Sequence, residues 1–165
     1  NHRKGFGPFP AGIRHATYND LSSVKALITA KTAAIIIEPV QGEAGVVPAK
    51  QEFLVGVRDL CTQNGVLLIM DEVQSGVGRM GHLFGYMAFG IEPDILTSAK
   101  GLGGGIPIGA TLTKNDIASS MIVGSHGSTF GGNPLAMKIG SAVLDIVSSK
   151  KFLNNVKKNS NYFEK

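Results

Sequence analysis

The sequence has no tryptophan, a single cysteine and no long hydrophobic run. One cysteine, Cys61, excludes an internal disulfide and suits a reducing compartment, so we expect a cytoplasmic protein. The longest apolar stretches, such as Val66–Met70, are far shorter than the roughly 20 residues that a membrane-spanning helix needs. We therefore expect no membrane partner. Cys61 follows Leu60 in a helical pattern, which favours a small buried hydrophobe over a catalytic thiol.

A charge excess is also missing over most of the chain, although the formal net charge is +4. Residues 150–165 hold five of the 16 basic and one of the 12 acidic side chains, which leaves 11 of each among residues 1–149. The lysine-rich end has no interleaved arginine, and a solvated helix face explains it. We expect no nucleic-acid partner.

Glycine, by contrast, is abundant, with 22 residues in 165. The glycines follow no G-X-Y period, which excludes a collagen-like chain. They cluster between the apolar segments, where a backbone without side chains can approach a ligand closely. The composition therefore indicates a globular domain with a shaped binding site.

Short apolar runs alternate with amphipathic segments, and 165 residues suffice for one domain. Such alternation predicts an α/β fold with a mainly parallel sheet flanked by helices and joined by right-handed crossovers. The predicted strands are Ala33–Val40, Val66–Val73, Asp94–Ala99 and Gly109–Thr113. The predicted helices are Leu21–Ala30 with Asp20 as N-cap, Lys50–Asn64 ending at Gly65, Pro134 to about Ser148, and Phe152 onward.

Asp71 directly follows the second apolar run, so its carboxylate emerges at the carboxyl end of a strand. Ligands of open α/β sheets bind at that edge. A buried carboxylate is costly unless it is paired, and a cationic ligand is one suitable partner. A helix cap or a salt bridge within the loop is the other interpretation, and spacing alone does not separate them.

Lys100 closes the third predicted strand and precedes the glycine-rich segment Gly101–Gly105. A desolvated amine in such a place can lose its proton and attack a carbonyl group. A solvated loop lysine is the alternative. A phosphate-binding P-loop is excluded, because GxxxxGK[ST] is absent and Lys100 precedes its glycines.

Two further patterns resemble binding motifs but do not predict a site. Gly76-x-Gly78-x-x-Gly81 matches the dinucleotide fingerprint, but the acid that should close the next strand is missing, since Asp94 begins that strand. We therefore do not expect a nucleotide site. The histidines lack metal-ligand spacing, so no metal site is expected.

Four segments in order then identify a family resemblance: EPVQGEAG (38–45), DEVQSGVGR (71–79), SAKGLGGG (98–105) and GSHGSTFGGNP (124–134). Together with GFGPFPAGIRHATYNDL (5–21), they resemble the class III aminotransferases, and within these the acetylornithine (succinyldiaminopimelate) aminotransferases. The resemblance covers essentially the whole chain. It implies the large domain of fold type I enzymes, with pyridoxal 5′-phosphate (PLP) as cofactor.

The resemblance also implies roles for residues at the strand ends. Lys100 matches the lysine that forms a Schiff base with the cofactor aldehyde and later shuttles a proton. Asp71 matches the aspartate that pairs with the pyridine nitrogen, which makes the ring an electron sink. Gln74 matches the residue near the phenolic oxygen, and Glu72 and Val73 complete the contacting turn.

Three more positions concern assembly and substrate. Thr129 resembles the threonine that reaches the cofactor phosphate of the neighbouring subunit, which implies a homodimer with shared active sites. Ser128 lies beside it, near the substrate, and Glu43 resembles the glutamate that pairs with a movable arginine. Ala44 departs from the glycine that is common in acetylornithine enzymes and matches the ornithine aminotransferases, so the substrate subgroup stays open.

The implied reaction moves an amino group between N-acetylornithine, or a similar ω-amino acid derivative, and 2-oxoglutarate. An ornithine or other ω-amine aminotransferase, or a truncated non-catalytic form of the fold, remains as an alternative. The resemblance places residues 1–165 in the central part of the large domain. The phosphate-binding turn, the stacking aromatic and the C-terminal small domain would lie outside them, so we expect this stretch alone to be inactive.

Overall fold

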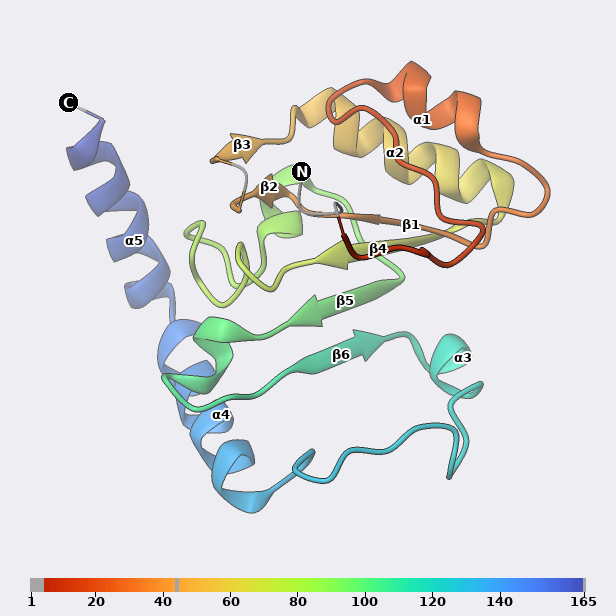
Figure 1. Ribbon diagram of the computed structural model, residues 1–165. Coiled ribbons are helices and arrows are strands. Elements are labelled where there is room, and N and C mark those ends of the chain that lie inside the picture. Colours follow the sequence, from red (N-terminus) through yellow and green to blue (C-terminus); the bar gives the residue numbers. More distant parts are fainter. Residues whose placement is uncertain (1–4, 44, 165) are drawn as a thin grey trace.

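The computed structural model describes residues 5–43 and 45–164, arranged around a four-stranded sheet (Figure 1). The strands are β1 (Ala34–Ile37), β4 (Leu67–Asp71), β5 (Ile95–Ser98) and β6 (Ala110–Thr113), in the spatial order β1-β4-β5-β6. The first three are parallel, and β6 is antiparallel to β5. The α/β class with a mainly parallel sheet is thus confirmed.

The reversal of β6 was not anticipated, and its cause lies in the connection from β5. That connection contains only the 3-10 turn η2 (Lys100–Gly103) and no crossover helix. A parallel neighbour needs a crossover of a dozen or more residues, usually helical. A short link returns the chain beside β5 in the opposite direction.

The first predicted strand is shorter than expected. It ends at Ile37, and the chain continues into a small antiparallel hairpin of β2 (Val40–Gln41) and β3 (Val47–Pro48). Pro39 lies between the two pieces, is fully buried and has no N–H to continue the ladder. Ala44, at which the sequence left the substrate subgroup open, lies outside the described residues.

Two helices pack over the β1 and β4 half of the sheet. Asp20 caps α1 (Leu21–Leu27), which is shorter than predicted, by accepting from the N–H groups of Ser22 and Ser23. The second helix, α2 (Gln51–Asn64), ends as predicted at Gly65, whose φ of +64° suits glycine. Its apolar side fills the core with Phe53, Leu54, Val57 and Cys61, against Leu68 and Met70 of β4.

Cys61 is fully buried, as expected of a small hydrophobe. Burial raises the pKa of its thiol to about 11, so the reactive thiolate is suppressed.

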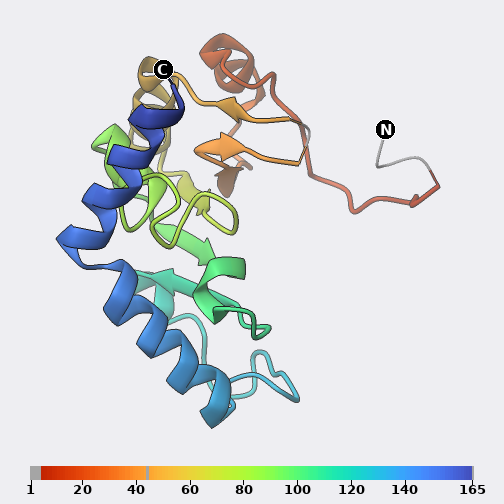
Figure 2. The ribbon, with the colours of Figure 1, turned by 90° about the vertical axis from the view of Figure 1, so that its left-hand side faces the viewer.

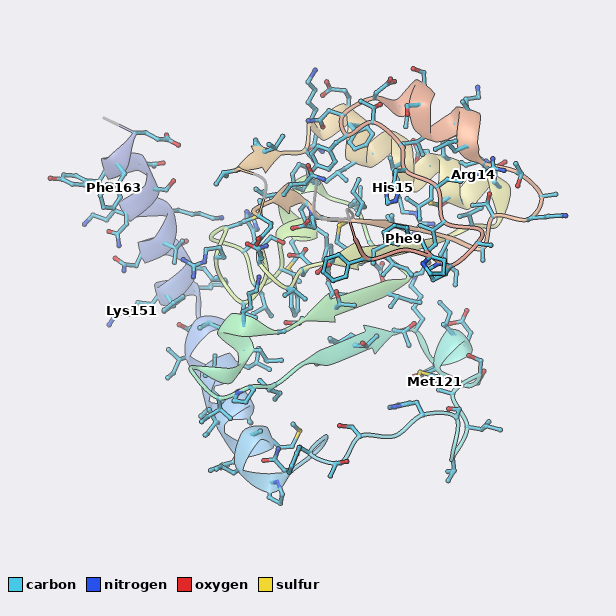
Figure 3. All side chains as sticks on the ribbon, in the orientation of Figure 1. Phe9, Arg14, His15, Met121, Lys151 and Phe163 are labelled. Carbon is cyan, nitrogen blue, oxygen red and sulfur yellow. The ribbon has the colours of Figure 1, made fainter. Side chains whose placement is uncertain are left out.

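Two longer helices complete the chain after the short α3 (Asn115–Ala118). Asn133 caps α4 (Pro134–Val147), and the Ser149 hydroxyl caps α5 (Lys150–Phe163), which begins two residues before the predicted Phe152. Figure 2 shows α2, α4 and α5 on the same side of the sheet. The side chains of Phe163 and Lys151 on α5 point away from the body (Figure 3).

The two faces of the sheet are therefore unequal. Leu68, Met70 and Leu96 share the buried face, whereas Ile36, one register position away, lies on the opposite face and is 65% exposed. The N-terminal segment with Phe9 and His15 passes in front of β1 on that opposite face (Figure 3). Across residues 5–43 and 45–164, every helix is too short or too polar to span a bilayer.

Candidate active site

Asp71 is the last residue of β4 and lies half-buried at the carboxyl edge of the sheet. Its Oδ1 atom accepts hydrogen bonds from the Val73 N–H at 3.0 Å and from the Thr97 hydroxyl at 3.1 Å. Among the described residues, both hydrogen bonds reach Oδ1, which leaves Oδ2 available. Thr97 on β5 thus fixes the orientation of a carboxylate that can still accept from a ligand.

Lys100 opens the η2 turn just after β5, next to the strand that carries Asp71. Its side chain is exposed, and its φ of +45° lies in the left-handed region that residues with a Cβ rarely adopt. Such a conformation costs on the order of 1–3 kcal/mol and is commonest at functional sites. The structure therefore places Lys100 at the same edge as Asp71, on a strained backbone.

Glu38 is an acidic residue at the same edge that the sequence pattern did not single out. It follows β1 directly, and burial together with the negative charge of Asp71 raises the pKa of its carboxyl group. The Gly42 N–H and the Lys100 ammonium act in the opposite direction. Glu38, Asp71 and Lys100 are therefore within electrostatic reach of one another. The acid was visible in the EPVQGE segment, but only the pairing of β1 with β4 places it beside Asp71.

Gln74 and Glu43 lie on the two segments that frame this edge. The Gln74 amide packs against Gly42, where a Cβ atom would overlap it. The hairpin loop that carries the exposed Glu43 therefore rests on the turn after β4. Val73, in the same turn, contributes its N–H to Asp71.

The Glu72 side chain does not join the site. It is 0% exposed, and its carboxylate accepts from the Ser75 hydroxyl at 2.7 Å and from the N–H groups of Gly85 at 2.8 Å and Tyr86 at 2.7 Å. Successive strand residues point to opposite faces, so Glu72 turns inward where Asp71 turns outward. The Glu72 side chain is therefore held within this loop, and its expected contact with a cofactor stays a prediction.

The glycines of the dinucleotide-like pattern have a packing role. A Cβ at Gly78 would meet Phe152 and Leu153, and one at Gly81 would meet the alkyl chain of Lys157. Both glycines also have positive φ, +82° and +72°. They let α5 lie close against the loop, and the segment opens no helix as a nucleotide fingerprint would.

Ser128 and Thr129 are not brought to Asp71 and Lys100 within this chain. Both are exposed on the segment between α3 and α4, beyond the β6 edge in both views (Figures 1 and 2). The Ser128 hydroxyl accepts from the Gly131 N–H at 3.0 Å, which shapes the turn before α4.

A hollow of about 650 Å³ lies at the opposite edge of the sheet, between α2 and the start of β4. Arg58 and Asp94 form an ion pair there at 2.8 Å, and Lys114 lies 3.7 Å from Asp94. These charges neutralise one another and tie the strand starts together. Over the described ranges, no group of three or more histidine, cysteine or acidic residues could hold a metal ion.

A family model described as "Aminotransferase class-III" matches residues 1–165. The chain belongs to the class III aminotransferases. These are PLP-dependent enzymes, and their fold is the one found here.

Solved structures of this family resemble the chain closely. Ornithine aminotransferase from Toxoplasma gondii shares 36% identity at a TM-score of 0.92, over 97% of this chain and 38% of that one. Acetylornithine aminotransferase from Elizabethkingia anophelis shares 40% identity at a TM-score of 0.89, over 97% and 41%. N-acetylornithine aminotransferase from Stenotrophomonas maltophilia shares 39% identity at a TM-score of 0.83, over 93% of this chain and 40% of that one. The chain thus spans about 40% of the length of these relatives.

The residues at the carboxyl edge fit the family's cofactor. Asp71 offers an oriented anionic oxygen that suits a protonated ring nitrogen, and Lys100 offers a primary amine that suits an aldehyde. The two lie on neighbouring strand ends, as one ring with substituents on opposite sides requires.

Proposed function

We propose that the protein transfers an amino group between N-acetylornithine, or a similar ω-amino acid derivative, and 2-oxoglutarate, using PLP. The observation that carries this proposal is Asp71, held by Thr97 at 3.1 Å, beside Lys100 on the next strand end. Bound PLP would supply an electron sink for the charge that develops when the substrate loses a proton.

The chain's own residues would then divide the work. Asp71 Oδ2 would accept from the ring nitrogen and keep it protonated, because an adjacent anion favours the charged form. Lys100 Nζ would hold the cofactor at its aldehyde and, when free, would move a proton at the substrate Cα. Val73 and the backbone of Glu72 hold the Asp71 turn, and the Gln74 amide faces the phenolic oxygen.

The partner and substrate contacts belong to the same proposal. Thr129 lies just before α4, where free helix N–H groups favour a phosphate. Since that segment lies away from its own Lys100, it would serve the cofactor of a second subunit in a homodimer. Ser128 would lie near the substrate there, and the exposed Glu43 would pair with the arginine that distinguishes the two substrates.

Ornithine is the second candidate substrate. Ornithine aminotransferases are as similar to the chain as acetylornithine aminotransferases, with 41% identity for the Plasmodium falciparum enzyme. Ala44 also matches that subgroup. Rates with N-acetylornithine and with ornithine, each at saturating 2-oxoglutarate, separate the two. A higher kcat/KM for ornithine would identify ornithine, and not N-acetylornithine, as the substrate.

Borohydride reduction of the purified, natural-length protein tests the chemistry. Peptide mapping should place a pyridoxyl group on Lys100, and the Lys100→Ala variant should carry none. Lys114 and Lys138 serve as internal controls, because they lie at other parts of the fold. A label on either would overturn the assignment of Lys100, and a colourless protein that takes up no PLP would favour the non-catalytic alternative.

A further inference from the structure

Glu38 and Asp71 lie side by side at the ends of two neighbouring parallel strands. Ile37, the last residue of β1, pairs with Met70 of β4, and Glu38 and Asp71 are the residues that follow them. Because side chains alternate along a strand, both carboxyl groups face away from the side that buries Met70. The register thus sets two carboxyl groups side by side at the proposed cofactor edge.

The Glu38 backbone and side chain are both fixed. The Tyr18 hydroxyl donates to the Glu38 carbonyl at 2.8 Å and to the Pro39 carbonyl at 3.2 Å. The Gly42 N–H lies close enough to the Glu38 carboxyl group to lower its pKa. Glu38 is also half-buried, so it differs from a solvated loop acid.

The charges around Glu38 are those of the proposed site. Asp71 and the exposed Glu43 raise its pKa in addition to burial, and the Gly42 N–H and Lys100 lower it. Tyr18, a further titratable neighbour, has its pKa raised to about 12 by burial and by Glu38, so it stays neutral. The ionisation of Glu38 is therefore coupled to the two groups that would hold the cofactor.

We infer that Glu38 is a positioning residue for the proposed reaction, acting through Asp71 and Lys100. The role rests on the proposed function, because it needs a ring nitrogen opposite Asp71. When Glu38 is ionised, its charge adds to the negative potential of Asp71 and favours a protonated ring.

The coupling is measurable without any cofactor. In ligand-free, natural-length protein with ¹³C-labelled glutamate carboxyls, the Glu38 signal is the one lost in Glu38→Gln. Asp71→Asn should lower the pKa of Glu38, and Lys100→Met should raise it. Glu52→Gln, an exposed change on α2, is the matched control and should leave the pKa of Glu38 unchanged. If the pKa of Glu38 were unchanged in both Asp71→Asn and Lys100→Met, the inference would be overturned.

Binding of pyridoxine 5′-phosphate gives a second readout, because this analogue has no aldehyde and cannot bond to Lys100. Glu38→Gln should weaken its binding roughly two- to fivefold, the range for a partly exposed charge interaction. Glu52→Gln should leave binding unchanged. Unchanged binding in Glu38→Gln would refute the role at the ring. The borohydride label on Lys100 tests the proposed function separately, so the two failures are distinguishable.

Discussion

The buried carboxylate of Glu72 supports the clearest stability prediction. The loop after β4 closes on this one side chain, which accepts three hydrogen bonds of 2.7–2.8 Å and is 0% exposed. In Glu72→Gln the amide oxygen can replace Oε2, which serves Ser75 and Gly85. The NH₂ group then faces the Tyr86 N–H, so one donor loses its acceptor.

The magnitude follows from that geometry. A hydrogen bond to a charged group contributes about 1.5–3 kcal/mol, and a buried donor left unpaired adds its own desolvation cost. We therefore expect Glu72→Gln to lower the free energy of unfolding by about 3 kcal/mol. Ser75→Ala removes one bond and leaves two, so it should cost about 1.5 kcal/mol, the lower end of that range.

Urea unfolding of the natural-length protein measures these differences, provided that the slope m is unchanged between variants. Glu92→Gln is the matched control, because its side chain is 76% exposed and it should cost less than about 0.5 kcal/mol. Gly85→Ala should act like Glu72→Gln, since its Cβ would lie 3.0 Å from Glu72 Oε2 and 2.7 Å from Met80 Sδ. If Glu72→Gln cost no more than Glu92→Gln, the carboxylate would not anchor this loop.

Three further predictions concern the site and the opposite edge. Asp71→Asn should still bind PLP, but kcat should fall by a factor that corresponds to several kcal/mol in the transition state, and near-normal turnover would exclude the electron-sink role. Thr129→Ala should weaken PLP binding, and mixing Lys100→Ala chains with chains that lack residues 124–132 should restore activity; no gain over the parents would indicate a site within one chain. Asp94→Asn should cost about 2 kcal/mol at pH 7, because Asp94 accepts from the Leu68 N–H and from Arg58, each at 2.8 Å. Burial raises the Asp94 pKa, but these partners together outweigh burial and lower it. The stability that they contribute is therefore present above the unfolded pKa of about 3.9 and is lost as pH falls through the folded value. A wild-type advantage over Asp94→Asn that persists at pH 2 would contradict this assignment.

Local signals in the sequence were sufficient for most elements. Gly65 ends α2 because only a residue without a Cβ adopts its φ cheaply, and Asn133 with Pro134 starts α4 by capping rules that act within one turn. The apolar runs before them also placed Asp71 and Lys100 at strand ends, where the structure has them, and the family resemblance supplied only the roles expected of them.

What the sequence did not reveal depends on contacts between distant segments. Glu38 and Thr97 join Asp71 only through the register of β1, β4 and β5, which no local pattern encodes. The inward turn of Glu72 likewise depends on donors 13 and 14 residues away, at Gly85 and Tyr86. Periodicity reports which residues are apolar, and it does not report the partners of a polar group.

The reversed strand β6 has a consequence for how the chain is delivered to its neighbours. The strands β1, β4 and β5 end at the edge that holds Asp71 and Lys100, but β6 carries the chain back to the far edge (Figure 1). The segment with Thr129 must then travel along the outside of the sheet before α4 returns to η2. A parallel β6 would have released this segment at the edge that holds its own Lys100. One change of strand direction therefore places the segment at the periphery of the fold, away from Asp71 and Lys100 of the same chain.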